Sequence, residues 1–363
     1  MNGKADASFK FGAGRYLMQQ GLLEIAGDEI GRYGKKPFIV GGPTAIGIVR
    51  ERLNIGLAKA GLTGTYSIHP GHVNHADARR KAEEGRAQGC DVVVAVGGGR
   101  AMDFGKLVAY YMDSPVVCVP TTISTCAAYS PFSVTYTPEG RTIPGNFCYD
   151  LENASILVDM DVMARQPARY VVAGLLDAMG KFVEIKNGHR EMPVSGTPMS
   201  LYAGYLLTKY TFERLEALID PVLEDLNAHR VSQALEDMVF INIPLTGIIS
   251  GLSRGVGQSA IAHDLYYQVR MFFPAQSQKA VHGEIVGLGI IPQLYYNGEP
   301  EKCEPFRAFL KRLGAPTCLS EIGVEPTDEN FEILYKATAD SIYLGKHEES
   351  RTRFREALTL IKS

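Results

Sequence analysis

Three polar side chains stand in apolar or small-residue surroundings in the second half of the sequence. Asp177 lies within the run VVAGLLDAMG, His263 within SAIAHD and His282 within KAVHGE. A carboxylate in such surroundings is costly unless it is paired, hydrogen-bonded or bound to a cation. One Asp and two His can form a zinc site with an open fourth position, the arrangement of a catalytic metal. Spacing alone leaves the ordinary alternatives open: a satisfied core or surface histidine, and an aspartate that is solvated or caps a helix.

A glycine-rich turn follows a buried strand in the first half of the sequence. Residues 92–96 form a continuous apolar run, which is typical of a parallel strand buried on both faces. Gly97, Gly98 and Gly99 come directly after it, and a helix is predicted over 100–112. A strand that ends in such a turn and opens a helix presents free N–H groups and a positive dipole end to an anion.

A second loop, rich in hydroxyl groups, follows the next predicted strand. Strand 116–119 ends at Pro120, and residues 121–125 read TTIST. Ligands of open α/β sheets bind at the carboxyl ends of the strands. The two loops together therefore suggest a pyrophosphate site, although a glycine triplet by itself is more often only a flexible turn.

The predicted secondary structure changes near residue 160, from alternating strands and helices to helices alone. Before it, strands alternate with helices, which predicts a parallel α/β sheet. The predicted strands are 9–14, 38–40, 65–68, 92–96, 116–119 and 155–159, with helices over 22–33, 45–60, 74–88 and 100–112 and a hairpin-like turn over 136–141. From residue 167 on, the predicted elements are helices only, over 168–187, 199–219, 231–252, 257–272, 284–296, 305–313, 328–340 and 351–361. We expect a nucleotide-binding α/β domain over 1–160, a helical metal-binding domain over 161–363, and a ligand cleft between them.

Length and composition narrow the class of protein. A chain of 363 residues exceeds a typical single domain, so two domains are expected. The net charge of -3 without a basic run gives no electrostatic footprint for nucleic acid or an anionic membrane. No apolar stretch approaches the roughly 18–20 residues that span a bilayer, and the N-terminus lacks the apolar core of a signal peptide. Six scattered cysteines without a C-x-x-C pair favour a reduced, cytoplasmic protein.

The sequence resembles the glycerol dehydrogenase branch of the iron-containing alcohol dehydrogenases, in order over nearly its whole length. In the first half the resemblance rests on GGG-x-x-x-D-x-x-K from Gly97 to Lys106, Pro120-Thr121, Ser130, Ser133-Val134 and Tyr136-Thr137. In the second half it rests on Gly174-x-x-Asp177-Ala178, Ala262-His263 and His282-Gly283-Glu284. The resemblance implies a Rossmann-like N-terminal domain, an all-helical C-terminal domain as in dehydroquinate synthase, and a nicotinamide cofactor in the cleft.

The resemblance also implies roles for individual residues. By this likeness the pyrophosphate lies on Gly97, Gly98 and Gly99, and Asp103 belongs to the same cofactor motif. Other positions that match cofactor contacts are Thr121, Ser124, Ser130, Phe132 and Tyr136. The positions that match the zinc ligands are Asp177, His263 and His282.

Two positions in the first half depart from the usual pattern of that family. Gly41 replaces the acid that usually binds the ribose after the second strand, which leaves NAD and NADP equally open. Cys126 stands where the glycerol enzymes usually carry an Asp that touches the polyol. Because a thiol is a poor partner for a diol, this position argues against glycerol as the substrate.

A third departure lies one helical turn after Asp177. Lys181 replaces the fourth ligand of the iron enzymes, a His, which favours three-ligand zinc. A buried cation at that place could hold a substrate carboxylate beside the metal. Together with the segment TCAAY around Cys126, Lys181 is similar to the hydroxycarboxylate dehydrogenases, which reduce 2-oxo acids. Lys181 could equally be a surface lysine or pair with Glu184.

These observations predict a metal-dependent, NAD(P)-linked oxidoreductase. It would interconvert a small secondary alcohol, either a 2-hydroxy acid or a polyol such as glycerol, and its ketone by hydride transfer, with Zn²⁺ or another divalent metal polarising the substrate oxygen. Asp177, His263, His282 and Lys181 are the predicted catalytic residues, Cys126 is the predicted substrate contact, and a water or a ribose hydroxyl would relay the proton. The resemblance and the apolar helices favour a homo-oligomer.

Two other classes of protein remain as alternatives. A cyclising lyase resembling dehydroquinate synthase would need several cationic side chains around the cleft, and few candidates exist beyond Arg100, Lys106 and Lys181. An inactive nucleotide-binding protein would predict a damaged set of metal ligands, whereas Asp177 and both histidines are present.

Overall fold

The chain divides into two compact units in the computed structural model, which describes residues 11–363 except 70, 151, 255 and 256. The first unit holds the described residues up to Pro138, Ile143–Val171 and Leu218–Gly251, and the second holds Glu139–Thr142, Val172–Ala217 and Leu252–Ser363. Each unit therefore takes up several separate stretches of the chain. The division into residues 1–160 and 161–363 stays a prediction of which parts fold on their own.

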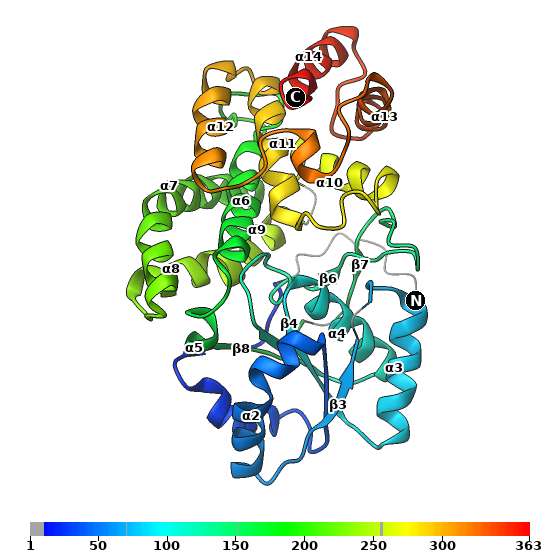
Figure 1. Cartoon of the computed structure of the whole chain (residues 1–363), viewed down its shortest axis with the longest axis vertical. Coiled ribbons are helices and arrows are strands. Elements are labelled where there is room, and N and C mark those ends of the chain that lie inside the picture. The colour runs from blue at the N-terminus through cyan, green and yellow to red at the C-terminus, as the bar shows by residue number, and fades with distance from the viewer. Residues whose placement is uncertain (1–10, 70, 151, 255–256) are drawn as a thin grey trace. The chain divides into compact units, whose positions relative to one another are not determined.

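A six-stranded parallel sheet forms the centre of the first unit, in the order β1-β8-β5-β4-β2-β3 (Figure 1). Its strands are β1 (Tyr16–Gln19), β2 (Pro37–Gly41), β3 (Thr65–Ile68), β4 (Val92–Gly97), β5 (Val116–Pro120) and β8 (Ser155–Asp159). Every residue of β2, β4, β5 and β8 is buried, which explains their nearly continuous apolar sequences. The predicted parallel α/β sheet is confirmed. The predicted strand 9–14 lies partly outside the described residues, and the structure forms β1 after it.

Helices cover both faces of this sheet, as its apolar strands require. They are α1 (Ala26–Ile30), α2 (Pro43–Lys59), α3 (His75–Ala87), α4 (Gly99–Met112) and the short α5 (Met160–Met163). Leu53 of α2 packs in one core with Val94 of β4. Ala95, the next residue of β4, points to the opposite face, where a Cβ at Gly105 of α4 would overlap its side chain. The sheet and α4 thereby hold the glycine turn between β4 and α4.

Two further elements of the first unit were only partly predicted. β6 (Phe132–Ser133) and β7 (Phe147–Cys148) pair antiparallel on either side of the expected turn. The predicted helix 231–252 consists of α8 (Gln233–Phe240), a π-helical segment (Ile241–Leu245) and α9 (Thr246–Leu252). Gln233–Leu252 is long and apolar enough to cross a membrane by length and composition, which corrects the expectation that no stretch has that character. Because 67% of its apolar window is buried inside the protein, a core helix is the simpler interpretation.

Helices alone build the second half of the chain as far as the structure describes it. They are α6 (Ala168–Glu184), α7 (Met199–Ala228), α10 (Ile261–Phe272), α11 (His282–Tyr296), α12 (Cys303–Arg312), α13 (Asp328–Ala339) and α14 (Glu348–Thr359). The predicted helical half is confirmed, although α7 continues past Pro221 and is longer than predicted. Three of these helices, α6, α10 and α11, carry the predicted metal ligands.

Candidate active site

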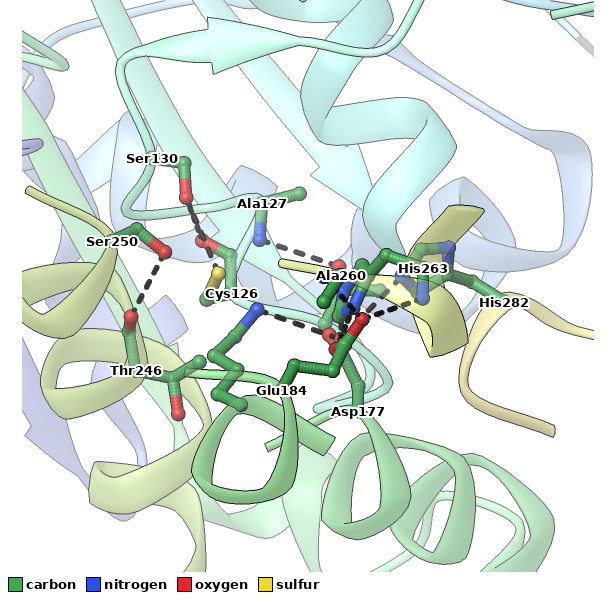
Figure 2. Close-up of polar contacts among 12 residues, drawn as sticks. Cys126, Ala127, Ser130, Asp177, Glu184, Thr246, Ser250, Ala260, His263 and His282 are labelled. Atoms are coloured by element: carbon green, nitrogen blue, oxygen red, sulfur yellow. Dashed lines mark hydrogen bonds and ion pairs between the residues drawn. The ribbon is translucent and has the colours of Figure 1, made fainter. Parts of the chain in front are cut away.

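The second unit brings Asp177, His263 and His282 together from three helices. Asp177 Oδ1 lies 3.2 Å from His263 Nε2 and 3.4 Å from His282 Nε2 (Figure 2). One possible ligand atom from each residue lies within 4.8 Å of the others. The Asp177 side chain is only 4% exposed and that of His282 is 22% exposed, so one side of the group is open to solvent. One carboxylate oxygen and two imidazole nitrogens are a donor set that suits zinc.

Glycines let the helices of this group approach one another closely. A Cβ at Gly283, the second residue of α11, would overlap the carbonyl oxygen of Ala173 in α6. A Cβ at Gly289, farther along α11, would lie 2.7 Å from the Cα of Ala262 in α10. Backbone therefore packs on backbone at both places. The first contact is next to His282 and the second is next to His263, so both lie beside a candidate ligand.

Burial and neighbouring charges set the protonation of the group. Burial favours a raised pKa for Asp177, but Lys181, His282 and His263 hold that pKa well below its ordinary range. Burial lowers the pKa of His282, which favours the neutral imidazole that binds metals. For His263 burial also acts to lower the pKa, but Glu184 and Asp177 outweigh it and raise the pKa to about 9. A metal that binds His263 must therefore displace a proton.

Glu184 is a member of the site that the sequence suggested only as a possible partner of Lys181. Its carboxylate contacts Nδ1 of His263 and accepts hydrogen bonds from the backbone N–H groups of Ala260 and His263, at 2.6 and 2.8 Å. Glu184 lies seven residues after Asp177 in α6, so the two carboxylates share one face of the helix. Two carboxylates at that spacing in an apolar helix are the signal that could have identified Glu184.

Lys181 is buried beside the group and is not a surface lysine. Its side chain is 5% exposed, and its Nζ lies 3.7 Å from Asp177 Oδ1. That separation is longer than a hydrogen bond but short enough for strong attraction at a buried site. Lys181 therefore places a positive charge one turn from the candidate ligand.

The first unit brings the two predicted phosphate-binding loops into contact. A Cβ at Gly98 would lie 2.9 Å from Thr122 Oγ1, and a Cβ at Gly99 would lie 2.7 Å from Thr125 Oγ1. Gly97 has a φ of 142°, a backbone conformation that favours glycine. Any side chain at Gly98 or Gly99 would thus displace the hydroxyl-rich loop from the turn.

The hydroxyl-rich loop is attached to the sheet and to its surroundings by hydrogen bonds of residues 121–124. Thr121 is buried, and its N–H donates to the carbonyl oxygen of Gly97 at 2.9 Å, which continues the pairing of β5 with β4. Ser124 Oγ lies 3.4 Å from Thr122 Oγ1. The Ile123 N–H donates to the buried side chain of Gln166. The two predicted cofactor contacts in this loop, Thr121 and Ser124, therefore lie beside the glycine turn.

A buried ion pair in α4 holds the segment that follows this loop. Lys106 Nζ lies 2.9 Å from Asp103 Oδ1. The same ammonium donates to three backbone carbonyls, those of Ala127, Ser130 and Phe132. Asp103 Oδ2 in turn accepts from the N–H of Val134 at 3.1 Å. Lys106 thus fixes the backbone at Ser130 and Phe132, while Asp103, a predicted cofactor residue, pairs with Lys106 and fixes the backbone at Val134. Lys106 is therefore engaged within the protein, which weakens the lyase alternative.

Cys126 and Tyr136 complete the predicted set within the first unit. Cys126 is buried, and its Sγ lies 3.3 Å from Ser130 Oγ (Figure 2). Tyr136 donates its N–H to the carbonyl oxygen of Val73 at 2.8 Å, which joins it to the loop after β3. The predicted cofactor residues of the first unit thus follow β4 and β5, at the carboxyl ends of two neighbouring strands, and Tyr136 also contacts the loop after β3.

The sequence is similar to that of known proteins over most of its length. Residues 13–158 match the family model "Iron-containing alcohol dehydrogenase". The glycerol-1-phosphate dehydrogenase [NAD(P)+] of Aeropyrum pernix is 31% identical over 86% of this chain and 84% of its own. The glycerol dehydrogenase of Thermotoga maritima is 29% identical over 86% and 84%, and hydroxycarboxylate dehydrogenase A of Escherichia coli is 28% identical over 73% and 72%.

The fold is that of solved members of the same group. A probable glycerol dehydrogenase from Sinorhizobium meliloti 1021 superposes with a TM-score of 0.81, covers 98% of each chain and is 22% identical. At that identity the likeness supports the fold alone. It extends over the parallel sheet and the helical half together.

Proposed function

Because the chain belongs to the iron-containing alcohol dehydrogenase family, we propose that it interconverts a small 2-hydroxy acid and its 2-oxo acid. The chain is an NAD-linked alcohol dehydrogenase of the glycerol dehydrogenase type. The observation that carries the narrower substrate class is the buried ammonium of Lys181, 3.7 Å from Asp177 Oδ1. A cation at that place suits a substrate carboxylate, and the thiol of Cys126 offers little to a polyol.

For the metal we propose zinc, held by Asp177, His263 and His282. The support is the chemistry of the donor set: three buried or half-buried donors that converge, with a carboxylate that its neighbours keep anionic. When bound, zinc supplies a Lewis acid for the substrate oxygen. Lys181 would orient the substrate through its carboxylate, so that the carbon to be reduced is presented in one direction only.

For the nucleotide we propose a pyrophosphate site at Gly97, Gly98 and Gly99. The remaining contacts would come from Thr121, Ser124, Ser130, Phe132 and Tyr136, with the ion pair of Asp103 and Lys106 fixing the segment that carries two of them. The close approach of the hydroxyl-rich loop to the glycine turn supports this assignment. When bound, the nicotinamide supplies or accepts the hydride.

We further propose that the site accepts both NAD and NADP. Strand β2 lies next to β4, and its last residue, Gly41, pairs with Val96 just before the glycine turn. A Cβ at Gly41 would overlap the carbonyl oxygen of Val96, so no carboxylate can stand there to repel a 2′-phosphate. Without this carboxylate, the 2′-hydroxyl of the NAD ribose also lacks its usual hydrogen-bond partner.

We also propose a cytoplasmic homo-oligomer. All six cysteines are free thiols in the structure, as expected for a reducing compartment. Light scattering on the purified protein would give the mass of the assembly.

The substrate proposal is tested by paired reductase assays on zinc-loaded protein, with 2-oxobutanoate and dihydroxyacetone and with NADH and NADPH. We expect Lys181→Met to lower kcat/KM for 2-oxobutanoate about 10–100-fold, the loss of one charge-assisted hydrogen bond, while zinc stays bound. Lys209→Met, which removes an exposed lysine of α7, is the matched control and should change neither rate. Reduction of dihydroxyacetone alone would return the chain to the polyol enzymes.

A further inference from the structure

Glu184 joins two helices through a fully buried carboxylate. Its Oε1 accepts from the N–H groups of Ala260 and His263, and its Oε2 contacts His263 Nδ1 (Figure 2). Ala260 is the N-cap of α10 and has no side chain that could cap the helix itself. Glu184 therefore supplies from α6 the cap that α10 lacks.

The same carboxylate constrains the proton on the imidazole. An ionised carboxylate can only accept hydrogen bonds, so Glu184 Oε2 stabilises a proton on Nδ1 of His263, as Asp177 Oδ1 stabilises one on Nε2. A metal bound at Nε2 would replace the proton there, and the single proton of the neutral ring would then lie on Nδ1, where Glu184 holds it. Nε2 is the atom that lies 3.2 Å from Asp177 Oδ1, within the group of candidate ligands.

We propose that Glu184 is a positioning residue that selects the metal-binding tautomer of His263 and fixes the direction of its ring. This inference rests on the proposed metal centre and adds a function for a residue that is not one of the candidate ligands. Carboxylates that hold the remote nitrogen of a ligating histidine strengthen metal binding by about 10–100-fold. A role in capping α10 alone predicts no such contribution.

Glu184→Gln separates the two roles. Only the oxygen of the glutamine amide can accept the hydrogen bonds from the two backbone N–H groups, so this oxygen takes the place of Oε1. The amide N–H₂ group is then directed at Nδ1, which must accept, so the proton moves to Nε2. The variant retains the cap of α10 but presents the wrong tautomer to the metal.

Glu284→Gln is the matched control. Glu284 also caps a helix that carries a candidate ligand, because its Oε2 accepts from the Val281 N–H at the start of α11, at 2.9 Å. A glutamine oxygen can accept the same hydrogen bond. We expect Glu284→Gln to bind zinc within twofold of the unchanged protein.

The test is a zinc titration against a chromophoric chelator, combined with ring-nitrogen NMR shifts of histidine-labelled, zinc-free protein at a pH where His263 is neutral. We expect Glu184→Gln to weaken zinc binding about 10–100-fold and to move the ring proton from Nδ1 to Nε2. Equal zinc affinity in Glu184→Gln and the unchanged protein would overturn the inference, as would equal losses in both glutamine variants.

The unchanged protein provides a test that does not depend on the variant being folded. If its His263 carries the proton on Nε2 at that pH, Glu184 does not select the tautomer and the inference is wrong. Absence of zinc binding by the unchanged protein would instead contradict the proposed metal centre, which keeps the two failures distinct.

Discussion

Three charged side chains share one face of α6 at its buried end: Asp177, Lys181 and Glu184. Each is almost completely buried, a position that an unpaired charge cannot hold without a large cost in free energy. The structure compensates them with one another and with His263, and Glu184 receives two backbone N–H groups besides. The charges are therefore interdependent, and replacing any one changes the electrostatic environment of the others.

Position 41 allows a residue-scale prediction about the nucleotide. Gly41→Asp should destabilise the fold by about 1–3 kcal/mol, since its Cβ would overlap the Val96 carbonyl. Gly42 has open space around it and is the N-cap of α2, where Asp is favourable. We expect Gly42→Asp to fold normally and to weaken binding of 2′,5′-ADP at least tenfold more than that of 5′-AMP, as measured by calorimetry. Equal losses for the two nucleotides would contradict the proposed position of the ribose.

At the scale of elements, the sequence predicted most of the helices and strands whose residues show a clear short-range pattern. The buried strands β2, β4, β5 and β8 were recognisable because strands covered on both faces need apolar residues throughout. The three candidate ligands stood out as polar groups in apolar surroundings, but only the resemblance to the family linked them into one metal site. β1 and the pairing of β6 with β7 were not predicted, because these elements have only two to four residues and too little pattern.

The part of the site that sequence reasoning missed depends on contacts between distant segments. Glu184 acquires its function from Ala260 and His263, which are more than 70 residues away and reach it only after α6 and α10 pack. The ion pair of Asp103 with Lys106 is local, but its hold on the Phe132 backbone is not. Helix periodicity carries no information about such partners.

Helix packing in the second unit makes an element-scale prediction. Gly283→Ala should push α11 away from the Ala173 carbonyl, cost about 1–3 kcal/mol and weaken zinc binding, because His282 precedes the contact. Gly47→Ala in α2 is the control, since nothing lies near its Cβ. That change should stabilise the protein by about 0.5–1 kcal/mol. Urea unfolding and chelator competition measure both effects, and unchanged zinc affinity in Gly283→Ala would contradict the assigned role of this contact.

On the scale of the whole molecule, the candidate metal ligands lie in one compact unit and the glycine turn lies in the other. Zinc and nucleotide should therefore stabilise different parts of the chain. By linkage, zinc at 100 times its dissociation constant should add about 2.7 kcal/mol to the free energy of unfolding of the structure that binds it.

Hydrogen exchange with and without a chelator checks this whole-molecule prediction. Removing zinc should increase exchange in α6, α10 and α11 and leave β4 and β5 largely unchanged. Adding NAD or NADP should protect the loops that follow β4 and β5 instead. A uniform increase in exchange over the whole chain after chelation would show that the two units do not respond separately.

The short spacing of the charged residues in α6 has an evolutionary consequence. Asp177 and Glu184 are reserved for the metal and its ligand in our proposal, whereas Lys181 between them is reserved for the substrate. A single codon change at position 181 could then shift a descendant from acids to neutral alcohols while the metal is retained. Paralogues with different substrate specificities could then arise from this fold without an inactive intermediate.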